Sequence, residues 1–446
     1  MKPRPRPLRA VPWLAPPLLV GALLRLWGLH RQIFLGDELH AVMSALTRPL
    51  PDILTTYRLA DHSIPLAALY RLLTEWGVGL SEGVLRAPSA LAGLALLVLV
   101  PVALLRWPGG GVGLCRATAA AWLLAVSPTL VYFSRFARPY AAVALLAAVA
   151  AGAFWRWWRA GPHGGHGWAV LYAASGAAAA WFFLGALPFV AAPLAWAAGD
   201  LLAGRLRGGA GEGRRGPVAL LAVAAGLAAG VAAFLLPALP SLLRLLEVKA
   251  ARGAAGPDAV VGVLRIQAGT AAAVPAVVVW ALAALGLATL ARRHPRLAGY
   301  GALLVAAQWI ALTLVLRPAG IHAPHTLNRY LVATVPVVLL WAAEGLSWLA
   351  GRGPVRGRWG RRLGTAGAVA AVAALALTGP YASDPGFRLG PFSGDWETLA
   401  LERRPVAFPA AMVPPAVLRL AAEPGDEPVA QVVGRLGPFS LWPVAA

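Results

Sequence analysis

The sequence predicts an all-α polytopic membrane protein. Its 446 residues are 59% hydrophobic and its mean hydropathy is +0.68, which is high for a soluble globular chain. Apolar runs of about 18 or more residues recur along most of the chain, and each is long enough to cross a hydrocarbon core of roughly 30 Å. The net charge of +21 comes largely from arginines in the short loops between these runs. That distribution is typical of a membrane protein with positive cytoplasmic loops and argues against nucleic-acid binding.

About eleven transmembrane helices are expected. The amino terminus is basic and precedes a long apolar run without a small-residue cleavage site, so we interpret this run as a retained first span. The only cysteine, Cys115, excludes an intramolecular disulfide. The predicted spans are Val11–Leu29, Arg86–Leu105, Arg116–Val131, Pro139–Trp158, Gly167–Leu184, Ala186–Ala203, Pro217–Pro240, Ala271–Ala291, Leu297–Leu316, Asn328–Leu349 and Leu363–Pro380.

The segment Ile64–Gly77 is apolar but contains Arg71 and Glu75 and is too short to span comfortably. The amino terminus and five basic loops fall on one side, taken as cytoplasmic, only if this segment does not cross. We therefore predict an interfacial helix in the outer leaflet. The five loops are Arg106–Arg116, Arg156–His166, Arg205–Arg215, Arg292–Arg296 and Arg352–Arg362.

Four segments then share the extracytoplasmic side: the first loop at His30–Leu85, the turn Tyr132–Pro139, and the loops Arg244–Thr270 and Arg317–Leu327. Residues 1–380 form the predicted transmembrane domain. The tail at residues 381–446 is expected to be a small extracytoplasmic folded extension, with disorder as the alternative.

Acidic and basic side chains are expected to gather on this outer face. Acid is scarce, with 18 Asp+Glu against 39 Lys+Arg, so an adjacent acidic pair at a membrane surface is a candidate for chemistry. Arginine on the outer side departs from the positive-inside trend and often binds a phosphate or a carboxylate; the alternative for any single one is a snorkelling side chain at a helix end. The candidates are Asp37, Glu38, Asp61, His62, Arg135, Arg138, Tyr140, Arg329 and Tyr330.

Arg25 and two histidines, His322 and His325, are polar residues near the outer side that we do not place in the predicted site. Arg25, near the outer end of the first span, is expected to snorkel. His322 and His325 lie at a spacing that suits a metal with a carboxylate, but two histidines in one loop are weak evidence. We therefore predict no metal and no other cofactor, with a divalent metal as the alternative that the residues do not support.

The order of short motifs resembles the GT-C superfamily of membrane glycosyltransferases, on the branch of protein O-mannosyltransferases and lipid A aminoarabinose transferases. The resemblance covers roughly the first 190 residues well and the remainder loosely. Its pieces are Asp37-Glu38, Asp61-His62-Ser63-Ile64-Pro65-Leu66, Gly79–Ser89, Ser127-Pro128, Ser134–Tyr140, Arg329-Tyr330 at the opening of a late span, and Asp395-Trp396-Glu397.

The resemblance implies transfer of a sugar from a polyprenyl-phosphate donor to the hydroxyl of a lipid, polysaccharide or protein acceptor. Such a transfer needs a base for the acceptor proton and positive charge for the departing phosphate. Asp37 is the predicted base, and Glu38 orients the acceptor or holds the local structure. Arg138 and Arg329 are the predicted phosphate clamp. Tyr140 and Tyr330 bind the sugar or phosphate, or simply pack, while Arg135, Asp61 and His62 complete the predicted donor-binding set.

Two other classes of protein remain as alternatives. A transporter or flippase of lipid-linked sugars also needs outer arginines, but should carry charge at mid-membrane depth; we expect no such residue in the predicted spans. A non-catalytic membrane scaffold predicts no site that joins Asp37, Arg138 and Arg329.

Overall fold

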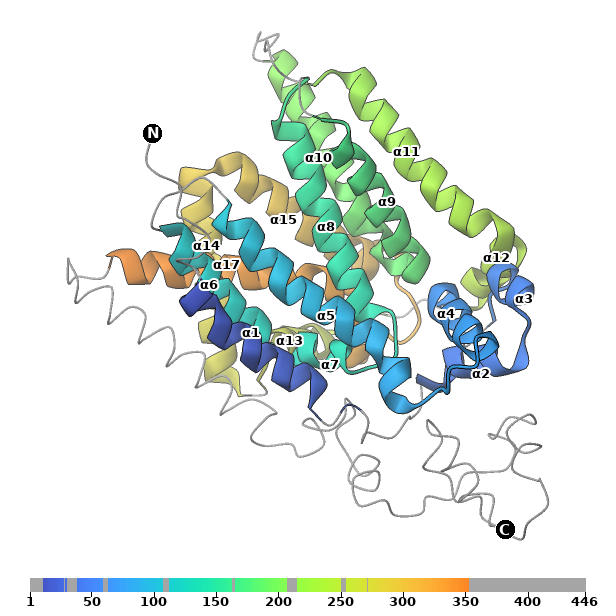
Figure 1. Cartoon of the computed structure of the whole chain (residues 1–446). Coiled ribbons are helices and arrows are strands. Elements are labelled where there is room, and N and C mark those ends of the chain that lie inside the picture. Colours follow the sequence, from blue (N-terminus) through green and yellow to red (C-terminus); the bar gives the residue numbers. More distant parts are fainter. Residues whose placement is uncertain are drawn as a thin grey trace.

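The computed structural model describes residues 11–27, 29, 38–58, 63–106, 112–162, 165–206, 215–249, 254–270 and 272–352. Helices build this part of the chain, and it contains no extended strand (Figure 1). The predicted span Leu363–Pro380 and the extension lie outside the described residues. The helices are α1 (Val11–Leu26), α2 (Leu39–Thr47), α3 (Leu50–Thr55), α4 (Ile64–Glu75), α5 (Glu82–Leu105), α6 (Val112–Val126), α7 (Pro128–Ser134), α8 (Tyr140–Arg159), α9 (Gly167–Phe182), α10 (Leu187–Leu206), α11 (Pro217–Leu235), α12 (Leu239–Lys249), α13 (Pro257–Ala268), α14 (Ala273–Arg293), α15 (Pro295–Ile310), α16 (Pro324–Tyr330) and α17 (Val335–Arg352).

The polytopic all-α class is confirmed, but the count of eleven spans is not. Among the described residues, seven helical segments are long and apolar enough to cross a membrane, and the bent pair α6 and α7 makes an eighth if it is one span. The segments are those of α5, α8, α10, α11 with α12, α14, α15 and α17. Helices α1 and α9 coincide with predicted spans but have only 16 residues each.

The third predicted span, Arg116–Val131, is broken rather than straight. Helix α6 ends at Val126, and α7 leaves at an angle of 59°. The break follows from Ser127 and Pro128: Pro128 has no N–H for the helical bond, and Ser127 caps α7 by accepting the N–H of Leu130.

The tenth predicted span, Asn328–Leu349, begins too early. Arg329 and Tyr330 belong to the short helix α16, and a 3₁₀ turn at Val332–Thr334 separates it from α17. Pro336 lies in the first turn of α17, where a missing N–H is tolerated, but it cannot continue a helix through the preceding turn. Arg329 therefore precedes the span instead of opening it.

Helix α4 is the predicted interfacial segment. Its 12 residues reach only about 18 Å, so it is too short to cross a bilayer. Helices α2, α3 and α4 cluster beside α12 at one end of the bundle (Figure 1), and the N–H of Tyr57 donates a 2.8 Å bond to Ser241 Oγ there. The predicted loop Arg244–Thr270 contains the end of α12 and all of α13.

Helices α8 and α17 are the most buried of the long helices. Close packing of α17 against α14 depends on two glycines that face each other. A Cβ on Gly286 would overlap the carbonyl of Trp341, and a Cβ on Gly345 would overlap that of Leu282. Small residues that let two backbones approach are a common basis of helix packing in membranes.

Candidate functional site

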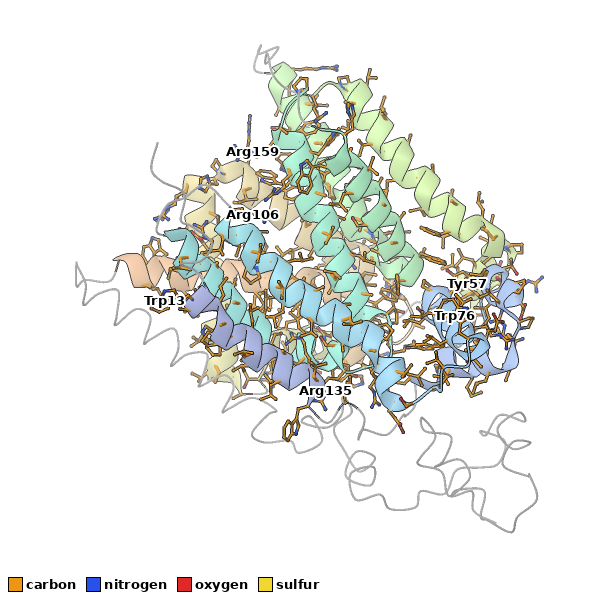
Figure 2. All side chains as sticks on the ribbon, viewed as in Figure 1. Trp13, Tyr57, Trp76, Arg106, Arg135 and Arg159 are labelled. Carbon is orange, nitrogen blue, oxygen red and sulfur yellow. The ribbon has the colours of Figure 1, made fainter. Side chains whose placement is uncertain are left out.

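The predicted outer segments meet at one end of the bundle, which we call the site end. Figure 2 places Arg135 at this end and Arg106 and Arg159 at the opposite one, which we call the basic end. The N–H of Ala137 bonds to Glu38 from the first loop. Thr129 in α7 bonds to the carbonyl of Ile266 in α13, and α13 shares a hydrophobic cluster with α16.

Glu38 forms a buried ion pair with Arg86, near the start of α5. Arg86 Nε lies 3.0 Å from Glu38 Oε1, and Nη2 lies 2.7 Å from Oε2. The two side chains are 2% and 0% exposed. Arg86 Nη1 also donates to the carbonyl of Leu29. Buried charges of this kind are tolerated because each finds a partner with good geometry.

The same carboxylate fixes the turn that carries Arg138. Glu38 Oε1 accepts a 2.7 Å bond from the N–H of Ala137, and Ser89 Oγ donates a 3.0 Å bond to the carbonyl of Arg138. The turn is thus held from both sides, and the residue that follows Ala137 is Arg138, which is buried. Glu38 thus contacts both Arg86 and the turn before Arg138, and its predicted part in the reaction stays a prediction.

Tyr70 of α4 is buried beside the Glu38–Arg86 pair, and nearby charges affect its pKa. Its hydroxyl donates a 2.6 Å bond to the carbonyl of Leu85. Burial raises the pKa of Tyr70 far above its ordinary value, and the Glu38 carboxylate raises it further, while the Arg86 and Arg138 guanidinium groups lower it. The Tyr70 hydroxyl thus binds the residue that directly precedes Arg86 of the buried pair.

Arg135 and Arg25 bind backbone carbonyls. Arg135 Nη1 donates a 2.9 Å bond to the carbonyl of Leu24, in the last turn of α1, where helical acceptors lack partners. Arg25, expected to snorkel, is instead 1% exposed and donates to the carbonyls of Leu124 and Ala125. Snorkelling was wrong because the break after α6 exposes acceptors that need a donor.

Aromatic rings connect Tyr140, at the start of α8, with Tyr330, at the end of α16. Phe183 lies between two of the predicted residues, with ring centroids 5.6 Å from Tyr140 and 5.2 Å from Tyr330. Burial raises the pKa of Tyr330 to about 12, the nearby Tyr140 adds to this, and Arg329 opposes it. The structure brings Tyr140 and Tyr330 to opposite sides of Phe183, a residue that was not among those predicted from the sequence.

Gln308 of α15 was also missed. It is fully buried; its Nε2 donates to the carbonyls of Gly185 and Tyr330, both at 2.7 Å, and its Oε1 accepts from the N–H of Phe189. One side chain thus fixes the backbone of Tyr330, next to Arg329. The sequence feature that could have indicated this role is a single glutamine in an otherwise apolar span.

Two buried amides at the site end have polar atoms without a hydrogen-bond partner among the described residues. In Gln267 of α13 both Oε1 and Nε2 are unpaired, and in Asn328 of α16 it is Oδ1. Both side chains are at most 3% exposed. Unpaired buried polar groups are costly, so such atoms are candidates for contact with a bound ligand.

Three of the nine predicted residues, Asp37, Asp61 and His62, lie outside the described residues, so their roles stay predictions, as does the joint action of Arg138 and Arg329. His325 lies in α16, and burial, with the charge of Arg329, lowers the pKa of this imidazole. The expectation that no metal is needed also stays a prediction.

A buried carboxylate that was not among the predicted residues lies inside a predicted span. Glu344 of α17 is 2% exposed and forms an ion pair with Arg116 at the start of α6; Arg293 Nη1 lies 3.8 Å from it. The expectation that no charged residue lies at mid-membrane depth stays a prediction, since the structure gives no membrane depth for Glu344. The carboxylate is paired with arginines from the basic end.

The fold resembles that of solved structures of ArnT. A crystal structure of ArnT from Cupriavidus metallidurans in the apo state matches with a TM-score of 0.53 and 18% sequence identity, over 96% of this chain and 71% of that chain. ArnT from the same organism bound to undecaprenyl phosphate gives a TM-score of 0.49 and 16% identity, over 97% of this chain and 74% of that chain. No family model and no curated protein matches the sequence. The likeness to the apo structure shows that the chain has an ArnT-like fold, which agrees with the fold that the sequence resemblance implied.

Proposed function

We propose that this protein is a glycosyltransferase that moves a sugar from a polyprenyl-phosphate donor to an acceptor hydroxyl on the extracytoplasmic face of the membrane. One observation carries the proposal: Glu38 is bound at once to Arg86 of α5 and to the N–H of Ala137. This arrangement ties the first loop, which contains Asp37, to the turn that contains Arg138.

In the proposed reaction, Asp37 accepts the proton of the acceptor hydroxyl. The acceptor oxygen forms a bond to the anomeric carbon of the sugar, and the bond from that carbon to the donor phosphate breaks. The phosphate leaves with the electron pair, and Arg138 and Arg329 stabilise its growing charge. Guanidinium suits this role because it binds phosphate with two hydrogen bonds and keeps its charge at any physiological pH.

The surroundings of α16 support a donor site beside this turn. Tyr140 and Tyr330 flank Phe183, and Gln308 fixes the backbone next to Arg329. Asn328 precedes Arg329 and has an unpaired buried oxygen, which is a suitable acceptor for a sugar hydroxyl. These groups would hold the sugar while the arginines hold the phosphate.

The two alternatives find less support. A flippase needs charge along a path through the membrane, and the buried span carboxylate Glu344 is paired with Arg116. A scaffold gives no reason to bury the polar side chains of Glu38, Arg138 and Asn328, because buried polar groups destabilise unless they are satisfied.

The test is turnover by the Asp37→Asn variant in nanodiscs, measured as release of polyprenyl phosphate from a panel of polyprenyl-phosphate hexoses and pentoses. Loss of a general base should lower the rate by about 10²–10⁴-fold. Asp258→Asn is the matched control, because Asp258 is an exposed acid at the same end, and it should keep its rate. If the Asp37→Asn variant keeps wild-type turnover, Asp37 is not the general base and another residue has that role.

A further inference from the structure

A cavity of about 450 Å³ opens at the basic end of the bundle, away from the proposed active site. It lies where the ends of α8 and α10 meet the turn between α14 and α15. Three tryptophans form its apolar wall: Trp155, Trp158 and Trp196. Their rings pack together, with centroids 5.4 Å apart for Trp155 and Trp196 and 6.3 Å apart for Trp158 and Trp196.

Four arginines also line this cavity: Arg159, Arg215, Arg293 and Arg296. Two are held by aromatic rings and therefore have defined positions. The Arg215 guanidinium lies 4.4 Å from the centroid of Trp157, and its Nε donates to the carbonyl of the same residue. Arg159 lies 5.9 Å from the centroid of Trp155. Cation–π contacts of this kind place the charge without neutralising it.

The cavity lining contains fewer acidic side chains than arginines. Asp200 is the one carboxylate among the lining residues; it accepts a 3.1 Å bond from Trp158 Nε1 and lies 3.6 Å from Arg296 Nε. Glu344 lies 3.8 Å from Arg293 but is shared with Arg116. The lining therefore keeps a clear excess of positive charge.

We propose that this cavity binds the phosphate of an anionic phospholipid from the cytoplasmic leaflet. Guanidinium groups bind phosphate through charge-assisted hydrogen bonds. Basic pockets between transmembrane helices on the cytoplasmic side suit acidic lipid headgroups, and tryptophan prefers the membrane interface. The exposed side chains of Arg159 and Arg296 lie at the surface, where a headgroup can enter.

The aromatic wall favours a lipid over a free phosphate ion. Three tryptophans line the cavity beside the charges, and a glycerol backbone with the first acyl carbons can contact them, whereas inorganic phosphate gains nothing from an apolar wall. Nε1 of Trp155 also lacks a hydrogen-bond partner among the described residues. The ester oxygens of a phospholipid are acceptors of the kind that this donor requires.

The experiment measures thermal stabilisation of the full chain in detergent during titration with phosphatidylglycerol, with phosphatidylcholine and inorganic phosphate as the other arms. Phosphatidylglycerol should stabilise the protein, and the effect should weaken at high salt. The double variant Arg159→Ala/Arg296→Ala should bind roughly 30-fold more weakly, about 2 kcal/mol. Arg292→Ala is the matched control, since Arg292 is exposed on the same turn but does not line the cavity.

Three results would overturn the proposal. Equal stabilisation by phosphatidylcholine would mean that charge is not recognised. Full stabilisation by inorganic phosphate would identify a site for a soluble anion instead of a lipid. Unchanged affinity in the double variant, with the variant still folded, would place the lipid elsewhere. The Trp196→Ala variant adds a second check, because removing one of the three wall tryptophans should weaken lipid binding while leaving the four arginines in place.

Discussion

Arg25 of α1 donates a 2.9 Å hydrogen bond to the carbonyl of Leu124, an acceptor that the proline at position 128 leaves without its helical partner. In an unbroken helix this carbonyl would accept the N–H four residues later, and Pro128 has none. A second bond from Arg25 reaches Ala125 at 3.1 Å. The broken segment α6–α7 and the arginine of another helix thus form one structural unit.

This relationship predicts that Arg25→Met destabilises the protein. Each buried carbonyl left unpaired should cost about 1–3 kcal/mol, which thermal unfolding in detergent will measure. Arg106→Met is the control, because Arg106 is exposed at the end of α5 and its replacement should change stability little. A stable Arg25→Met protein would show that another donor or water serves these carbonyls.

The Glu38–Arg86 pair predicts a large loss of stability when one partner is removed. Glu38→Gln keeps the shape but leaves the Arg86 charge buried without its counterion, which typically costs about 3–5 kcal/mol. The exposed pair of Arg71 and Glu75, at 2.7 Å in α4, is the matched control, since an exposed ion pair contributes at most about 1 kcal/mol. If Glu38→Gln and Glu75→Gln unfold alike, the buried pair does not hold the first loop in place.

The phosphate clamp predicts graded effects at Arg138 and Arg329. Lysine keeps the charge but loses the two-pronged hydrogen bonding, so Arg→Lys at either position should lower turnover in part. Arg→Ala should lower it further, chiefly in kcat, because charge on the phosphate develops as the sugar departs. Arg265→Ala, at an exposed position at the same end, should keep wild-type kinetics. If the substitutions at Arg138 and Arg329 change only KM, these arginines bind the donor but do not stabilise the departing phosphate.

The topology predicts which sites react with a membrane-impermeant thiol reagent. In a Cys115→Ser background, cysteines at Ser81 and Ser383 should be labelled from outside the cell, and a cysteine at Gly209 should not. Ser81 is exposed and caps the site end of α5. Labelling of the Gly209 variant in intact cells would place the basic end outside and reverse the proposed sidedness.

The amino-acid sequence by itself determined the membrane class, the position of most helices and the grouping of the predicted outer segments at one end of the bundle. These features depend on local properties: an apolar run must satisfy its own backbone in lipid, so helix and approximate length follow from composition. The cost of moving arginine across the membrane similarly sorts the loops by side. The short helix α4 was predictable for the same reason.

Only the tertiary structure decided which polar groups meet. Arg86 pairs with Glu38, which lies 48 positions away in the sequence. Nothing in the local sequence of either residue indicates that the other is its partner. Phe183 and Gln308 support α16 from two other helical regions, and Arg25 serves a break that belongs to a different helix. The reason is physical: a buried polar group in a membrane protein must find a partner wherever packing provides one, and packing depends on the whole bundle rather than on neighbours in the chain.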